Sequence, residues 1–215
     1  MHTRRRLLAT LAGGLALLPA APAAAQNPLR CNAKGSTTIA FAGSIRVFTV
    51  QRRGRLDQRD WHACRTPRGR ATLIHDGARN ETARAPQIVA GRYVGIIAER
   101  IAPIDGGRDR IVRVLDLTTR RFTVRRRDVD RSPPAEVRPR SDEFAVLHDG
   151  SAAFVETGDP ESSLLLARPR TTQLTTLDAT AQGDETVQIT DLAASPRTLY
   201  WRNGSTTKSF DYRTG

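Results

Sequence analysis

Apolar and polar residues alternate along much of the chain with the two-residue period of a β-strand, most clearly between Arg110 and Val124. Successive side chains of residues 111–116 would point to opposite faces of such a strand. Residues 117–120 fit a tight turn, after which residues 121–124 can return beside the first strand. The stretch therefore predicts an antiparallel hairpin.

The same arrangement of strand, tight turn, strand, loop and strand recurs four times. The predicted repeats cover about residues 36–75, 86–125, 142–178 and 186–213. The first three add a turn and a fourth strand, whereas the last ends after three strands. Their first turns, at Gly43, Gly91, Gly150 and Ser195, follow one another at intervals of 48, 59 and 45 residues.

Four strands in roughly 40–50 residues are typical of a β-propeller blade. No segment after residue 25 has a helical period. We therefore predict an all-β protein, with residues 36–215 forming one β-propeller-like array of about four antiparallel blades. An irregular β-sandwich would produce the same evenly spaced strands and is the alternative fold.

One repeat also resembles a known family. Residues 92–98 and then residues 111–123, with Asp116-Leu117-Thr118-Thr119 at the turn, resemble the repeats of TolB-like and WD40-like β-propellers of the bacterial cell envelope. The resemblance covers most of residues 36–212. It implies a propeller fold and a scaffold role, and it implies no particular activity.

Polar stretches between the predicted strands are expected to be loops. They are residues 51–60, 75–85 and 101–110 and the proline-rich linker 125–141.

Residues 1–25 have the features of a secretory signal peptide. A basic start is followed by an apolar run over residues 7–18 and by Ala23-Ala24-Ala25 ahead of Gln26. The apolar run is well short of the roughly 20 residues that a membrane helix needs, and no later segment is long and apolar enough. We expect an exported mature chain of 190 residues with no membrane anchor, located outside the cell or in the periplasm and cell envelope.

The start Thr3-Arg4-Arg5-Arg6-Leu7-Leu8 also resembles a twin-arginine export signal, and an ordinary basic start is the alternative. Residues 26–35 would form an extended lead. This lead could supply the strand that the last repeat lacks and so close the array into a ring. We expect a monomer, and an open arc that pairs with a second chain is the alternative.

The two cysteines, Cys31 and Cys64, both belong to the mature chain. Their separation fits neither a C-x-x-C redox motif nor a zinc site. An isolated pair in an exported protein predicts one structural disulfide. This bond would fasten the lead to the strand that contains Cys64.

The mature chain is basic. Removal of residues 1–25 leaves 31 lysines and arginines against 22 acidic residues, a formal charge of +9. Such a charge can attract nucleic acid, anionic lipid or anionic polymers of the envelope. The arginines are scattered over nearly every segment, so we predict no specific nucleic-acid site.

The sequence contains no recognisable catalytic or cofactor motif. It has no G-x-S-x-G element and no glycine-rich phosphate loop. The histidines of the mature chain, His62, His75 and His148, do not have the spacing of zinc ligands. We therefore predict no catalytic, cofactor-binding or metal-binding residues.

Some residues could carry chemistry but have a simpler structural role. His75-Asp76-Gly77 and His148-Asp149-Gly150 are expected to be turns, because Asp-Gly favours a turn and adjacent side chains of an extended chain point apart. Candidate pairs of glycosidase carboxylates are Asp142 with Glu143, Asp159 with Glu161 and Asp184 with Glu185, which we expect to be loop charges. The segment from Asp105 to Asp109 is a poor calcium loop.

These observations favour an exported, non-enzymatic propeller-like scaffold that binds an unknown protein or envelope polymer. One alternative is an extracellular hydrolase or lyase that uses loop carboxylates. Another is a basic protein that adsorbs to anionic envelope polymers.

Overall fold

The computed structural model describes residues 29–52, 54–66, 69–77, 81–101, 108–130, 143–157, 162–180 and 188–213. The predicted signal peptide lies outside the described residues. The described chain is all-β, as the sequence predicts, and its strands form four antiparallel sheets.

Each sheet contains strands that are consecutive in the sequence and hydrogen-bonded in the same order. The first sheet comprises β1 (Ser36–Ala42), β2 (Ile45–Arg52), β3 (Arg55–Arg65) and β4 (Thr72–His75). The second comprises β5 (Glu81–Val89), β6 (Tyr93–Ile101), β7 (Arg108–Asp116) and β8 (Arg121–Asp130). The third comprises β9 (Phe144–Val146), β10 (Ala152–Thr157), β11 (Ser162–Ala167) and β12 (Leu174–Ala179). The last has three strands, β13 (Ile189–Ala194), β14 (Thr198–Asn203) and β15 (Thr206–Asp211).

The four sheets share one pairing register. The first residue of the second strand faces the last residue of the third strand in every sheet. The pairs are Ile45 with Arg65, Tyr93 with Asp116, Ala152 with Ala167 and Thr198 with Asp211. In three sheets the residue that follows the third strand donates its amide to the carbonyl of the residue just before the second strand. The donors are Thr66, Leu117 and Tyr212, at 2.6, 3.0 and 3.1 Å.

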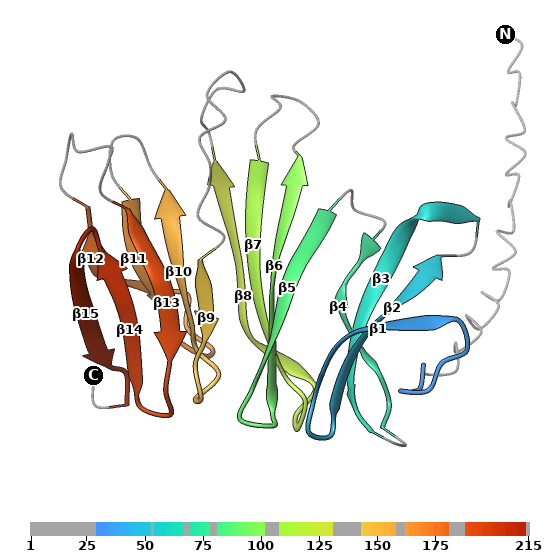
Figure 1. Ribbon diagram of the computed structural model, residues 1–215. Coiled ribbons are helices and arrows are strands. Elements are labelled where there is room, and N and C mark those ends of the chain that lie inside the picture. Colours follow the sequence, from blue (N-terminus) through green and yellow to red (C-terminus); the bar gives the residue numbers. More distant parts are fainter. Residues whose placement is uncertain are drawn as a thin grey trace, which may run out of the picture.

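The sheets stand in a row, with the first and last sheets at opposite ends (Figure 1). Three apolar layers fill the spaces between successive sheets. Residues on alternate faces of β6 contribute to two of them: Val94 and Ile96 pack toward the first sheet, and Tyr93 and Ile97 pack toward the third. Gly95 lies between them, and a Cβ there would come within 2.1 Å of the Val146 side chain, so the second and third sheets approach closely at this point.

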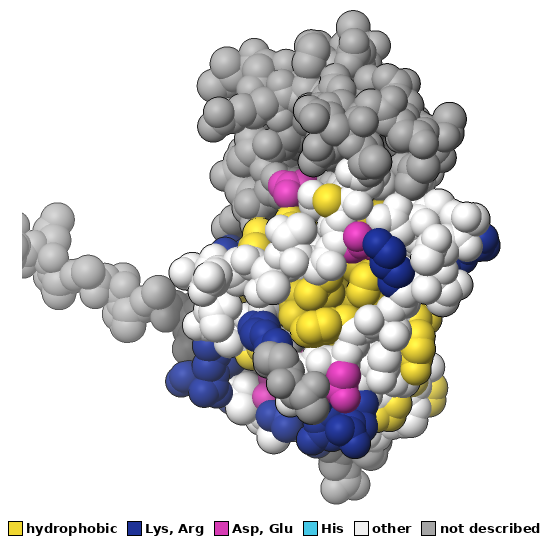
Figure 2. All heavy atoms as spheres, turned by 90° about the vertical axis from the view of Figure 1, so that its left-hand side faces the viewer, with side chains coloured by type: hydrophobic (Ala, Val, Ile, Leu, Met, Phe, Trp, Pro, Cys, Tyr) yellow, Lys and Arg dark blue, Asp and Glu magenta, His cyan; other side chains and the backbone are white. Residues whose placement is uncertain are grey.

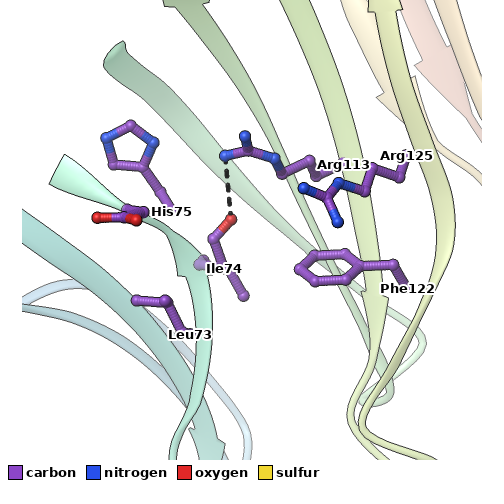
Figure 3. A pocket seen from close by; sticks show the side chains of 7 residues that line it. Leu73, Ile74, His75, Arg113, Phe122 and Arg125 are labelled. Atoms are coloured by element: carbon purple, nitrogen blue, oxygen red, sulfur yellow. Dashed lines mark hydrogen bonds between the residues drawn. The ribbon is translucent and has the colours of Figure 1, made fainter. Parts of the chain in front are cut away.

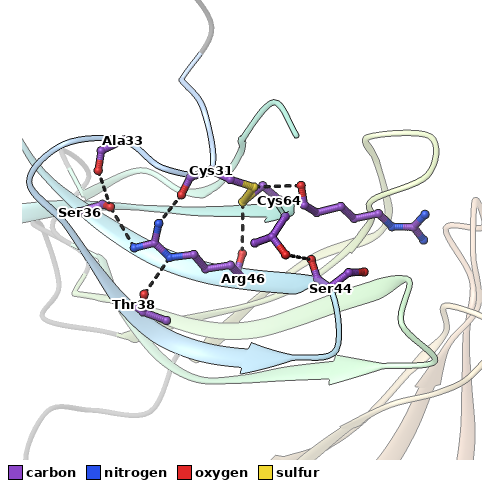
Figure 4. Close-up of a disulfide and its surroundings, with 9 residues drawn as sticks. Cys31, Ala33, Ser36, Thr38, Ser44, Arg46 and Cys64 are labelled. Atoms are coloured by element: carbon purple, nitrogen blue, oxygen red, sulfur yellow. Dashed lines mark hydrogen bonds between the residues drawn. A yellow bond between two sulfur atoms is a disulfide. The ribbon is translucent and has the colours of Figure 1, made fainter. Parts of the chain in front are cut away.

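The lead covers the outer face of the first sheet (Figure 4). A disulfide joins Cys31 to Cys64 with a Cα–Cα distance of 5.7 Å, which confirms the predicted bond. Cys31 donates its amide to the Gly69 carbonyl at 3.1 Å, and Ala71 donates to Leu29 at 2.8 Å. Pairing of the lead with the last sheet, which would close the array, is not among these contacts and stays a prediction.

An arginine fixes the path of the lead. Arg46 of β2 donates to the Cys31 carbonyl, to the Ser36 hydroxyl at 3.0 Å and to the Thr38 hydroxyl at 2.8 Å. Its guanidinium also lies 4.7 Å from the centre of the Phe48 ring. Phe48 and Cys64 are buried beneath the lead, and Cys31 of the lead is buried against them.

Several strands are longer than the sequence pattern predicts. The predicted loop over residues 51–60 is largely strand, because β2 and β3 continue their hairpin to a turn at Gly54, whose φ is +77°. The predicted linker from residue 125 begins instead with β8, which pairs with β7 as far as Asp130. Strands of this kind with one solvated face tolerate many charged residues, so polarity alone misplaces their ends.

Candidate functional site

A groove of about 170 Å³ lies between the first and second sheets (Figure 3). We call it the inter-sheet groove. Its lining consists of Leu73, Ile74, His75, Asp76, Arg113, Phe122 and Arg125. These side chains come from β4 and the residue after it on one side and from β7 and β8 on the other.

The wall formed by β4 follows from the alternation of that strand. Ile74 is 2% exposed in the apolar layer between the first two sheets, whereas Leu73 points outward and is 42% exposed. Phe122 of β8 packs half-buried against the same layer. The groove therefore has an apolar lining with one leucine open to solvent.

A buried ionic cluster lies beside this lining. Glu81 of β5 accepts a hydrogen bond from Arg113 Nη2 of β7 at 3.0 Å. His75 Nδ1 lies 3.4 Å from the same carboxylate oxygen, a contact that is longer than a well-formed hydrogen bond. All three side chains are at least nine-tenths buried, and Arg113 Nη1 also donates to the Ile74 carbonyl at 3.4 Å. The cluster therefore ties the last strand of the first sheet to two strands of the second.

The environment of Glu81 keeps it ionised. Burial alone would raise the pKa of Glu81, but contacts with His75 and Arg113 outweigh burial and lower that pKa. Arg113 and the carboxylate neutralise each other inside the protein. Removing one member of such a pair leaves an uncompensated buried charge, so the arrangement suits structural support.

The rim of the groove carries charges that face solvent. Asp76 binds Arg52 Nη2 at 3.0 Å, and Arg52 also contacts Asp60 at 3.3 Å. Arg125 is exposed and makes no ion pair or side-chain hydrogen bond with any residue in the described parts of the chain. Arg125 is therefore the groove charge available to an external anion.

The structure separates the two His-Asp-Gly triplets. His148-Asp149-Gly150 forms a turn, in which Asp149 accepts hydrogen bonds from the amide and hydroxyl of Ser151, each at 2.9 Å. His75 instead ends β4 and is buried in the ionic cluster. Sequence reasoning missed its partner Glu81, because the carboxylate lies in a segment that we expected to be a loop and polar residues there look solvated.

The candidate carboxylate pairs do not form a described site. Of the six residues, only Glu143 lies within the described chain, and its Oε2 accepts the Leu192 amide at 3.1 Å. The segment from Asp105 to Asp109 lies largely outside the described residues.

A second internal carboxylate joins the third and last sheets. Asp178 of β12 accepts hydrogen bonds from Trp201 Nε1 at 2.7 Å, from Asn203 at 3.0 Å and from Lys208 at 2.8 Å. Burial alone would raise the pKa of Asp178, but these hydrogen bonds and the lysine charge lower it. Each of these two sheet interfaces therefore depends on an ionised carboxylate.

Within the described residues, no group of three or more histidine, cysteine or acidic side chains is placed to hold a metal ion. The same residues include no helix long and apolar enough to cross a membrane. No protein-family model matches the chain, and no curated protein matches it either.

Proposed function

We propose that the protein is an exported, non-enzymatic binding scaffold whose sheets are the blades of an open, propeller-like array. The first strands β1, β5, β9 and β13 approach one another in succession along the row, as the inner strands of propeller blades do. A β-sandwich has one apolar layer between two sheets, whereas this chain has three layers between four sheets.

The observation that carries the binding role is the charge of Arg125, which pairs with no carboxylate of the described residues and lies beside an apolar groove. Pockets that enclose a small-molecule ligand usually occupy roughly 300–1,000 Å³, so this groove fits one side chain of a larger partner. Leu73 and Phe122 would contact an apolar group, and Arg125 would bind a carboxylate beside it. We infer that the partner is a protein segment with adjacent apolar and acidic groups.

The buried cluster supports binding over catalysis. The Glu81 carboxylate already contacts Arg113 and His75, and His75 is 3% exposed. A general base must come within hydrogen-bond reach of the proton that it removes from a substrate. These groups instead hold the groove walls in place.

The test is site-specific photo-crosslinking in the native host, with benzoylphenylalanine in place of Leu73. We expect one discrete crosslinked product, which disappears when Arg125→Glu is added. The control places the same amino acid at Thr207, an exposed position of the last sheet. Identical products from both positions, or none from position 73, would contradict the proposal.

A second measurement addresses the hydrolase alternative. We expect no turnover of envelope polysaccharides or peptides by the mature protein. Turnover that is lost in a folded His75→Ala variant would show that the cluster is catalytic.

A further inference from the structure

The antiparallel topology gathers seven turns along one edge of the row, at the same end of all four sheets. These are the β1–β2, β3–β4, β5–β6, β7–β8, β9–β10, β11–β12 and β13–β14 connections, at the lower end of the sheets in Figure 1. The end of β15 lies there too. We call this surface the turn face.

Arginines that are distant in the sequence converge on the turn face. Nine lie in these turns, directly beside them or just after β15: Arg65, Arg70, Arg92, Arg120, Arg121, Arg168, Arg170, Arg197 and Arg213. The described acids at the same positions are Asp116, Asp149 and Asp211. The turn face therefore has a net positive charge that the order of residues along the chain does not reveal.

Among the described residues, these three acids pair with only two of the nine arginines. Asp116 binds Arg92 at 2.7 Å, and Asp211 lies 3.6 Å from Arg197. Asp149 is bonded to Ser151 within its own turn. Arginines that form no ion pair within the described residues are Arg70, Arg120, Arg121, Arg170 and Arg213.

Arg65 also has no carboxylate partner among the described residues. Its Nη2 donates to the Gly91 carbonyl at 3.0 Å and to the Thr118 hydroxyl at 3.3 Å, both neutral acceptors in the second sheet. The guanidinium is thereby held between two neighbouring turns.

The opposite edge of the row is different, because several of its basic residues are paired with carboxylates. These pairs are Arg52 with Asp60 and Asp76, Arg84 with Glu99, and Lys208 with Asp178. Figure 2 looks onto the side where β12 and β15 lie, and Lys and Arg side chains gather at its lower end. The charge of the described chain is therefore polarised toward the turn face.

We propose that the turn face docks on the anionic surface of a lipid bilayer. The turns end at a similar level across the four sheets (Figure 1), which suits a broad planar partner. Arginines near such a surface are attracted by its negative potential. Phe41, two residues before the Gly43-Ser44 turn, is 62% exposed and can enter the interface between headgroups and acyl chains.

The test is flotation of the mature protein with two kinds of phosphatidylcholine vesicle. One kind contains roughly 30% phosphatidylglycerol, which gives the vesicle a negative surface potential, and the other contains none. We expect binding only to the anionic vesicles, weakening as salt rises because exposed charges are screened. Each arginine near the surface contributes about fivefold to partitioning. Arg121→Glu combined with Arg213→Glu should therefore weaken binding about 30-fold or more.

The matched control is Arg55→Glu combined with Arg59→Glu, which changes net charge equally on an exposed part of β3 away from the turn face. We expect it to lose several-fold less binding than the turn-face pair. Equal losses in the two variants would mean that net charge alone drives adsorption and would overturn the proposal. Absence of binding to anionic vesicles at low salt, in protein with a native circular dichroism spectrum, would overturn it as well.

Phe41→Ser separates a bilayer from a soluble polyanion. We expect this variant to lose vesicle binding several-fold and to elute from a heparin column at an unchanged salt concentration. Unchanged vesicle binding would mean that Phe41 does not enter the bilayer. Tight heparin binding by the parent protein without vesicle binding would assign the turn face to an anionic polymer.

Discussion

The outer faces of the first and last sheets differ in whether the lead covers them. The outer face of the first sheet carries Phe48, which is fully buried because the lead and the disulfide cover it. On the last sheet, the exposed Tyr200 and Arg202 of β14 alternate with Leu199 and Trp201, which pack against the third sheet. The first sheet is thus covered by the chain itself, whereas the side of the molecule where the last sheet lies presents apolar side chains at its centre among polar ones (Figure 2).

The largest expected effect is the difference in stability loss between two aromatic substitutions, one in the first sheet and one in the last. Phe48→Ala should lower the free energy of unfolding by about 3–5 kcal/mol, because it leaves a cavity beneath the lead. Tyr200→Ala should change it by about 0.5–1 kcal/mol, because Tyr200 is 43% exposed. Urea unfolding of both variants measures the difference, and equal losses would remove the contrast.

Loss of the disulfide should come next. Replacing Cys31 and Cys64 with serine should destabilise the protein by about 3–4 kcal/mol, since the bond closes a loop of 33 residues in sequence separation. Thermal unfolding should show a melting temperature lower by roughly 10 °C. Once the lead detaches, the apolar face that it covered should also bind the dye ANS. An unchanged melting temperature and no dye binding would show that the lead stays in place without the bond.

The next prediction compares the carboxylate between the first and second sheets with the carboxylate between the third and last sheets. Glu81→Gln should cost about 3 kcal/mol, because Arg113 would keep a buried charge without its partner. Asp178→Asn should cost about 1–2 kcal/mol, because Lys208 is partly solvated and the new amide can keep some hydrogen bonds. Chemical unfolding of both variants gives the two values. A larger loss for Asp178→Asn would reverse the order.

The pH dependence of stability has the smallest expected effect. The pKa values of Glu81, Asp116 and Asp178 are all lowered, so the unfolded chain binds protons at these sites more readily than the folded chain. Their contribution is present above about pH 4–5 and is lost as the pH falls through the folded pKa values. Each group changes stability by at most about 1.4 kcal/mol per pH unit. Asp178→Asn should flatten the curve in acid, and an unchanged slope would contradict this assignment.

The sequence predicts what short-range patterns determine. Alternation locates most hairpins, Asp149-Gly150 marks a turn, and an isolated cysteine pair gives the disulfide. The last sheet shows this, since the repeat expected over about residues 186–213 with three strands contains the three strands β13, β14 and β15.

The sequence does not predict what depends on the arrangement of sheets. Glu81 lies in a polar segment. Only the position of β4 beside the second sheet, in which β5 and β7 flank β6, brings Glu81 to His75 and Arg113. The arginines of the turn face are scattered along the chain, and only the repeated meander places them on one surface. Alternation also fails for β3 and β8, because charged residues occupy their solvated faces.

The open row is tested most directly by hydroxyl-radical footprinting of the mature protein. We predict rapid oxidation of Tyr200 and Phe41 and protection of Phe48, with Phe48 becoming reactive once the Cys31–Cys64 bond is reduced. Protection of Tyr200 to the same degree as Phe48 would contradict the account. It would mean either that the lead closes the array over the last sheet or that a second chain covers this sheet.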